Sequence, residues 1–201
     1  MTATQPFPVA GVIGRGDADE ELVERCLDGD VEAFAILVKR YQRPIYNAAY
    51  RVLGRQEDAA DVTQTVFLKV AEHLRDFDPR HRFFSWIYRI AMNEALSLLR
   101  RAGRDEPMDE DADFEAPAGE QPERQVAAAQ AARRIQQVLM GMRPADRAVI
   151  ALRHFSECSY EEIAQILDIE VKTVKSRLFE ARSRMRVLLE DLRPSQGATA
   201  S

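Results

Sequence analysis

The stretch from Ser159 to Leu189 constrains the fold most, because it predicts two helices joined by a tight turn. Ser159 and Glu162 form a capping box, in which the Ser hydroxyl accepts from the third helical amide and the Glu carboxylate accepts from the Ser amide. Residues 168–170 interrupt the apolar pattern. A second apolar stripe then recurs at steps of three and four residues: Val174, Leu178, Ala181, Met185 and Leu188. We therefore expect a helical hairpin whose apolar faces pack together.

Outside its stripe, the second of these helices is polar and cationic. The side chains concerned are Lys172, Thr173, Lys175, Ser176, Arg177, Arg182, Arg184 and Arg186. A short capped helix followed by a longer basic one is typical of a helix-turn-helix, whose second helix enters the major groove with its N-terminus first. Lys and Arg can then reach guanine edges or phosphates. The alternative, on this pattern alone, is a plain helical hairpin with a solvated basic face.

The distribution of charge removes an objection to nucleic-acid binding. The 201-residue chain has a formal net charge of -5, which at first argues against it. Between residues 103 and 124, however, nine acidic residues stand against two basic ones, so that the rest of the chain sums to +2. This segment is also rich in Pro, Gly and Ala and has no periodicity. It predicts a flexible acidic linker between two domains.

Residues 80–101 combine aromatic and cationic side chains. On a helix, Phe83, Ile87 and Ala91 turn inward, and one polar flank carries Arg82, Ser85, Arg89, Asn93 and Arg100. Such a flank suits single-stranded nucleic acid, because Arg meets phosphates, aromatic rings stack on bases and Asn reads a base edge. The alternative is that the aromatic rings belong to the hydrophobic core and the Arg side chains are only solvated. We favour this alternative for Phe83 and Trp86 but not for Arg89 and Asn93.

Three further helices are expected before this segment, and the first begins near Asp19 and stops at Gly29. Asp30 should cap a helix that ends at Gly54, with Pro44 kinking or splitting it. A helix over residues 57–75 buries Ala59, Val62, Val66, Val70 and Leu74 and presents Asp61, Gln64, Thr65, Leu68 and Glu72 on its opposite face. An exposed Leu68 either anchors a protein partner or has no role, since single apolar residues are common on surfaces.

Several classes of function find no support in the sequence. The two cysteines, Cys26 and Cys158, lie far apart without nearby His ligands, so we expect no metal site and a buried, reduced thiol at Cys26. There is no long apolar span and no signal-peptide pattern, which favours a cytoplasmic protein without membrane insertion. No nucleophile arrangement, phosphate-binding Gly loop or paired carboxylates are evident, so we expect no enzyme activity and no cofactor.

The predicted fold is all-α, with two small helical domains joined by the acidic linker and a helix-turn-helix in the second. The expected boundaries are a disordered N-terminal tail (1–18), a first domain (19–102), the linker (103–123), a second domain (124–192) and a C-terminal tail (193–201).

Three segments, in this order, resemble the extracytoplasmic-function (ECF) class of the bacterial sigma-70 family, the small RpoE-like alternative sigma factors. The polymerase-binding helix of the family's region 2 is similar to EDAADVTQTVFLKV, residues 57–70. The promoter-melting segment is similar to FFSWIYRIAMN, residues 83–93, and region 4 is similar to residues 143–185. The resemblance spans residues 20–192. It implies a factor that acts with core RNA polymerase to start transcription at particular promoters.

The resemblance also implies a role for each set of residues. Core polymerase would meet Asp61, Gln64, Thr65 and Leu68; the melted minus-10 element would meet Arg82, Ser85, Arg89, Asn93 and Arg100; and the minus-35 element would meet Lys172, Thr173, Lys175, Ser176, Arg177 and Phe179. Members of this family are commonly held inactive by an anti-sigma factor, which is therefore an expected partner. Glu170 and Glu180 depart from the residues that many relatives carry. The alternative function is a helix-turn-helix regulator that binds duplex operator DNA without polymerase.

Overall fold

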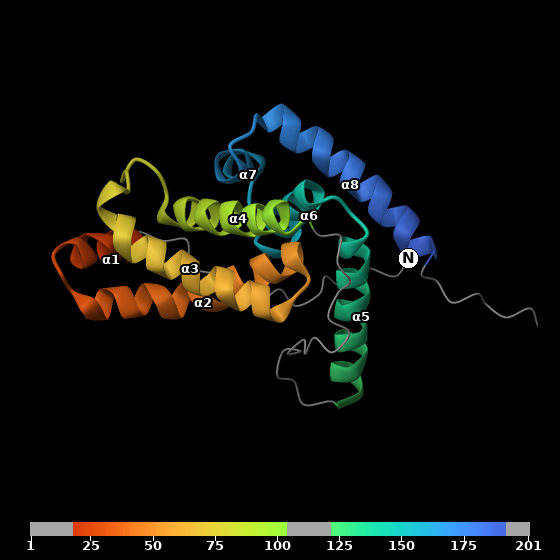
Figure 1. Cartoon of the computed structure of the whole chain (residues 1–201), viewed down its shortest axis with the longest axis horizontal. Coiled ribbons are helices and arrows are strands. Elements are labelled where there is room, and N and C mark those ends of the chain that lie inside the picture. The colour runs from red at the N-terminus through yellow and green to blue at the C-terminus, as the bar shows by residue number, and fades with distance from the viewer. Residues whose placement is uncertain (1–17, 104–121, 192–201) are drawn as a thin grey trace, which may run out of the picture.

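The structure is a computed structural model that describes residues 18–103 and 122–191 (Figure 1). Every regular element in these ranges is helical. The first half holds α1 (Ala18–Leu27), α2 (Val31–Leu53), α3 (Gln56–His73), a 3₁₀ turn η1 (Leu74–Asp76) and α4 (Phe83–Ala102). The second half holds α5 (Pro122–Met140), α6 (Pro144–Ile150), a π-helical turn η2 (Ala151–Phe155), α7 (Tyr160–Leu167) and α8 (Val171–Asp191). The all-α prediction is confirmed, whereas nearly all of the predicted tails and linker lie outside the described residues.

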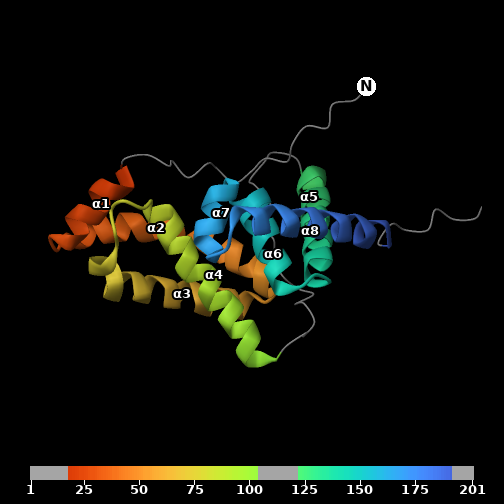
Figure 2. The ribbon, with the colours of Figure 1, turned by 90° about the horizontal axis from the view of Figure 1, so that it is seen from above.

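The first half is a bundle in which α2, α3 and α4 pack on one another and α1 closes one end (Figures 1 and 2). Asp30 caps α2 as expected, because its carboxylate accepts from the amides of Glu32 and Ala33 at 2.9 and 3.2 Å. The predicted stripe of α3 from Ala59 to Leu74 is buried. Of the two predicted effects of Pro44, a kink or a split, the split does not occur, because α2 runs as one helix through that position. Burial of the apolar stripes on both sides of Pro44 keeps the two segments in one helix.

The second half contains the predicted helix-turn-helix. Pro144 lies in the first turn of α6. The capping box at the start of α7 is present, with the Glu162 amide 3.1 Å from Ser159 Oγ and the Ser159 amide 2.8 Å from Glu162 Oε2. Asp168 then takes a left-handed conformation, with φ of 53°, which ends α7 and turns the chain into α8. Val174, Leu178 and Ala181 are buried between α8 and the helices beneath it.

The two halves share one hydrophobic core rather than lying apart. α2 contacts α5, α6 and η2, while α4 contacts α6 and α7 (Figure 2). Two buried polar side chains of the second half donate to backbone carbonyls at the end of α2: Gln136 Nε2 to Tyr50 at 3.0 Å and Arg147 Nη1 to Val52 at 2.8 Å. The last carbonyls of a helix lack intrahelical partners, so Arg147 satisfies one and places positive charge at the negative end of the helix dipole.

The Arg51 guanidinium strengthens the same junction. It lies 4.1 Å from the ring centroid of Phe155, which the π-helical turn presents. Burial lowers the pKa of Arg51 to about 10, so this side chain stays charged at neutral pH. A charged group over an aromatic face is attracted by the ring quadrupole, by about 2 kcal/mol when the pair is removed from water.

Candidate nucleic-acid and polymerase interfaces

The cationic flank of α4 consists of residues 82, 85, 89, 93 and 100, which helical spacing brings toward one side. Arg82, Arg89, Asn93 and Arg100 are exposed there. Ser85 is only 5% exposed, so its prediction as a surface contact is not met in this conformation. α4 packs on α2, α3 and α7, and α7 and its C-terminal cap pair with the arginines that precede and follow Ser85 in the sequence.

An aromatic layer supports the start of this flank. The Phe83 ring lies 5.9 Å from that of Phe77 and 5.8 Å from that of Trp86, and Tyr41 meets Phe83 edge-on at 5.5 Å. Phe83 is buried and Trp86 is half-buried, which confirms that Phe83 belongs to the core. The rings therefore form a rigid floor that fixes the direction of the polar side chains on α4.

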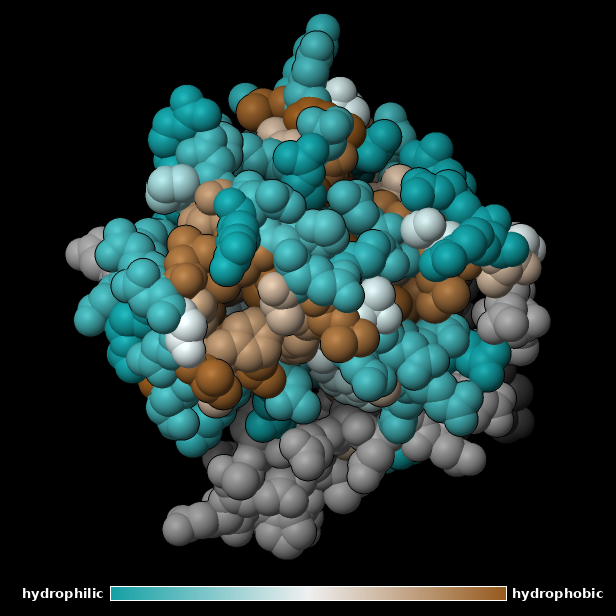
Figure 3. Space-filling view, turned by 60° about the vertical axis from the view of Figure 1, so that its left-hand side comes forward, coloured by the Kyte–Doolittle hydropathy of each residue, from teal (hydrophilic) through white to brown (hydrophobic). Residues whose placement is uncertain are grey.

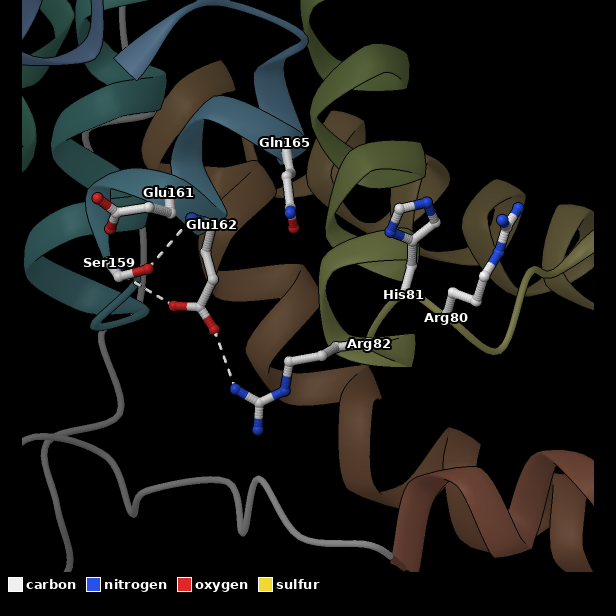
Figure 4. A pocket seen from close by; sticks show the side chains of 7 residues that line it. All are labelled: Arg80, His81, Arg82, Ser159, Glu161, Glu162 and Gln165. Carbon is white, nitrogen blue, oxygen red and sulfur yellow. Dashed lines mark hydrogen bonds and ion pairs between the residues drawn. The ribbon is translucent and has the colours of Figure 1, made fainter. Parts of the chain in front are cut away.

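Two ion pairs join the flank to α7. Arg82 Nη1 lies 3.4 Å from Glu162 Oε1, and Arg89 Nη2 lies 3.7 Å from Asp168 Oδ2. Figure 4 shows Arg82 reaching across to the carboxylate that also caps α7. The crevice between them, of about 400 Å³, has one wall with Arg80 and Arg82 and an opposite wall with Glu161 and Glu162. This pairing could not be predicted from the sequence, because the partners are 79 or 80 residues apart.

The face of α3 opposite the core is exposed. Asp61, Gln64 and Leu68 lie on it, and Thr65 is half-buried at its edge. Leu68 is 57% exposed, which is unusual for a large apolar side chain on a helix whose other apolar residues are mostly covered. Lys69 Nζ pairs with Glu94 Oε1 at 2.6 Å and so ties α3 to α4. This face is available to a protein partner in the described structure.

The N-terminal turns of α8 present a mixed polar and apolar surface. Lys172, Lys175 and Ser176 are exposed, whereas Thr173 and Arg177 are half-buried. Phe179 is 74% exposed although it is the largest apolar side chain on this surface. Figure 3 shows that hydrophobic patches interrupt a mostly hydrophilic surface on another face of the molecule, so exposed apolar side chains are not confined to α8. An aromatic ring beside cations and hydroxyls suits the major groove, where it can contact a thymine methyl group.

Glu170 and Glu180, the acidic residues that depart from many relatives, each make a hydrogen bond in the structure. Glu180 Oε2 lies 3.3 Å from Arg143 Nη2, and the same guanidinium binds the buried carboxylate of Asp146. The carbonyl of Glu170 accepts from the Val174 amide and so begins the hydrogen bonding of α8. Glu180 therefore links α8 to Arg143, the residue that precedes α6.

Other predicted absences and sites can be compared with the described residues. The described ranges contain no cluster of three His, Cys, Asp or Glu side chains that could hold a metal. No helix in these ranges is long and apolar enough to cross a membrane. Cys26 is half-buried rather than buried, because it lies near the end of α1 next to the exposed turn, and Cys158 is the buried thiol.

The amino-acid sequence is similar to those of known proteins. Residues 37–105 match sigma-70 region 2, and residues 132–185 match sigma-70 region 4. The RNA polymerase sigma-H factor of Pseudomonas aeruginosa is 35% identical over 185 residues, which cover 88% of this chain and 96% of the relative. The ECF RNA polymerase sigma factor SigW of Bacillus subtilis is 34% identical over 179 residues, which cover 85% of this chain and 96% of the relative.

This chain belongs to the ECF class of the sigma-70 family. It is an alternative sigma factor, which directs promoter-specific transcription initiation. Among solved structures, CnrH in complex with the cytosolic domain of CnrY is 28% identical, with a TM-score of 0.69 over 88% of this chain and 100% of that chain. The sigma factor RpoE in complex with the anti-sigma factor NepR from Bartonella quintana, at 23% identity, shares the fold, with a TM-score of 0.65 over 81% of this chain and 100% of that one.

Proposed function

We propose that this sigma factor uses three separate surfaces: α3 for core RNA polymerase, the flank of α4 for the melted minus-10 element and the N-terminal turns of α8 for the minus-35 element. The observation that carries the proposal is the α4 flank. Exposed Arg89, Asn93 and Arg100 stand on a helix whose first turn is fixed by packed aromatic rings. A protein that reads only duplex DNA has no need of such a surface.

The chemistry of the flank suits a separated strand. Arginines attract phosphates, and the Asn93 amide can both donate to and accept from a base edge. Unpairing a base costs a few kcal/mol, so a surface that hydrogen-bonds only the correct base makes melting depend on sequence. Trp86 would support the bases from beneath, since it is half-buried against Phe77 and Phe83.

The other two surfaces complete the assignment. On α8, Lys172, Lys175, Ser176 and Phe179 would contact bases or phosphates, while half-buried Thr173 and Arg177 would support them. On α3, Leu68 would enter an apolar pocket of the polymerase, with Asp61, Gln64 and Thr65 around it as a polar rim.

Regulation and location follow from this assignment. An anti-sigma factor that covers both halves would block all three surfaces, and CnrH and the RpoE of Bartonella quintana were each solved with a bound protein. The site of action would be the cytoplasm, where polymerase and promoters meet. The chain would supply no catalysis itself, because phosphodiester synthesis belongs to the polymerase.

Two substitutions with opposite expected effects test the assignment. Asn93→Ala should lower promoter opening by about tenfold while leaving affinity for core polymerase unchanged, because it removes one base contact worth about 1–3 kcal/mol. Leu68→Asp should weaken binding to core at least tenfold without unfolding the protein, because it places a charge in an apolar contact. Core binding is measured by titration and opening by the permanganate reactivity of thymines.

Matched controls separate these effects from general damage. Asn47→Ala removes another exposed Asn, on α2, and Val31→Asp places the same charge on another exposed apolar residue. Both should behave as wild type. Equal loss of core affinity in Asn93→Ala, or unchanged core affinity in Leu68→Asp, would contradict the roles given to α4 and α3.

A further inference from the structure

Glu180 is an acidic residue on the surface of α8 that we propose for the minus-35 element. The buried side of α8 carries Val174, Leu178 and Ala181, whereas the Glu180 side chain is 62% exposed. At about 100° and about 1.5 Å per residue, Glu180 lies about 40° from Ser176 around the helix axis and about 6 Å further along it. A carboxylate is therefore part of the exposed side of α8 that also carries Ser176.

Arg143, the residue that precedes α6, binds one of the two oxygens of this carboxylate. α6 packs on α8 (Figures 1 and 2), and Arg143 Nη2 lies 3.3 Å from Glu180 Oε2. The other oxygen, Oε1, has no hydrogen-bond partner in the part of the chain that the structure describes. One acceptor atom of Glu180 is thus tied to Arg143, and the other is left for a donor outside the chain.

Arg143 is itself fixed by a buried carboxylate. Its Nε lies 2.8 Å from Asp146 Oδ2 and its Nη2 lies 3.2 Å from Asp146 Oδ1, a pairing through two bonds that restricts the direction of the guanidinium as well as its place. Asp146 is 2% exposed, and its hydrogen bond is the largest cause that raises the pKa of Arg143. Exposed ion pairs contribute little to stability. The contact with Glu180 therefore matters more for the direction of that carboxylate than for the stability of the fold.

An oriented carboxylate oxygen distinguishes the four bases by the groups that they present in the major groove. Cytosine presents the N4 amino group, which donates to a carboxylate. Guanine presents the acceptors N7 and O6, and thymine presents the acceptor O4, so that a carboxylate is repelled by both bases. Adenine places the acceptor N7 beside its N6 donor and is intermediate. A carboxylate at this place on α8 therefore favours cytosine.

We infer that Glu180 is a specificity-determining residue that selects a cytosine in the minus-35 element, and that Arg143 is the positioning residue that orients its carboxylate. This role rests on the proposed function, because α8 must be the helix that reads the minus-35 element. The offset of about 6 Å between Glu180 and Ser176 corresponds to about two base pairs of DNA. The selected cytosine therefore lies about two base pairs from the base that is nearest Ser176.

The test uses holoenzyme assembled from core polymerase and the full-length protein. Holoenzyme is mixed with fragments of a promoter that it transcribes, randomised over the minus-35 region, and the bound fragments are sequenced. Glu180→Ala removes the carboxylate and Glu180→Gln replaces it with an amide. Arg143→Lys keeps a cation beside the buried Asp146 but lacks the planar fork that reaches two carboxylates. The control, Glu170→Gln, removes a charge from an exposed residue just before α8 that has no ion pair in the described ranges.

With the wild type, one position should favour cytosine over guanine and thymine by about fivefold or more. Glu180→Ala should abolish this preference, and Glu180→Gln should shift it toward adenine, whose N6 and N7 pair with an amide. Arg143→Lys should lower the cytosine preference at this position alone, whereas loss of fold would lower binding to every sequence. The control should keep the wild-type preference.

Four results would contradict these roles. An unchanged base preference in Glu180→Ala would make the pair with Arg143 a surface link only, and an equal loss in the control would reveal a general effect of charge. An unchanged preference in Arg143→Lys would remove its positioning role. Lys175→Ala, a second change on α8, separates the remaining case. If this variant and Glu180→Ala both leave base preference and promoter affinity unchanged, α8 does not read the minus-35 element, and the proposed function fails together with the role of Glu180.

Discussion

Leu178 and Phe179 are sequence neighbours on α8 with opposite surroundings. Leu178 is 1% exposed and belongs to the core of the second half, whereas Phe179 is 74% exposed. In the proposed assignment, Leu178 serves stability and its neighbour Phe179 serves DNA recognition. The exposed ring of Phe179 is the side chain that we propose to contact a base edge.

Substitution of each residue by Ala should separate the two roles. Phe179→Ala should change the free energy of unfolding by less than about 0.5 kcal/mol, yet weaken binding of the holoenzyme to its promoter about fivefold, because an apolar contact in the major groove is lost. Leu178→Ala should cost about 2–5 kcal/mol of stability through the cavity that it leaves. Urea unfolding and promoter titration measure the two quantities. A strong loss of stability in Phe179→Ala would contradict its surface role.

For single residues, the sequence predicts helix caps well and contacts with distant parts of the chain poorly. Asp30, Ser159 and Glu162 could be assigned as caps because each acts on amides within three residues of itself. The ion pairs of Arg82 and Arg89 could not be predicted, since their partners lie 80 and 79 residues further along the chain. Hydrogen bonds between residues close in sequence can be predicted from a short window of sequence. Contacts with residues far along the chain cannot.

Among the elements, α7 is a short helix whose N-terminus is fixed by a capping box. It has only eight residues, and isolated helices of that length are unstable in water. Its capping box satisfies two amides, and Glu162 does so while also reaching Arg82. One carboxylate therefore serves both the start of the helix-turn-helix and its contact with α4.

Removal of the cap should weaken this element measurably. Ser159→Ala should lower the free energy of unfolding by about 1 kcal/mol, because the amide of Glu162 loses its acceptor. Ser183→Ala, at an exposed position inside α8, is the matched control and should have little effect, since Ala favours helices. Urea denaturation followed by circular dichroism provides the comparison. Equal midpoints for the two variants would show that the capping box contributes nothing.

Periodicity located the helices and their buried faces, but it did not show every irregularity. The stripe on α3 and the stripe on α8 were both predictable from steps of three and four residues. The π-helical turn at Ala151–Phe155 was not, because its sequence continues an ordinary helical pattern. Such turns place one extra residue in a helix, and this one brings Phe155 to Arg51.

For the whole molecule, the resemblance to a family predicted more than the residue pattern did. Helix-forming stretches and charge indicated two helical halves and a basic reading helix. They did not predict that Gln136 and Arg147 would bind the end of α2, since each is an unremarkable polar residue on a predicted helix. Docking of the halves arises from contacts across 86 and 95 residues, which no short window records.

The central claim is that this chain makes core RNA polymerase specific for certain promoters. The most direct measurement is run-off transcription with purified core polymerase, with and without the full-length protein, on a library of promoter fragments. We predict transcripts from a subset of fragments only when the protein is present, with shared sequence at the minus-35 and minus-10 positions. No transcripts, together with tight binding of the protein alone to duplex DNA, would contradict the claim and indicate a conventional helix-turn-helix regulator.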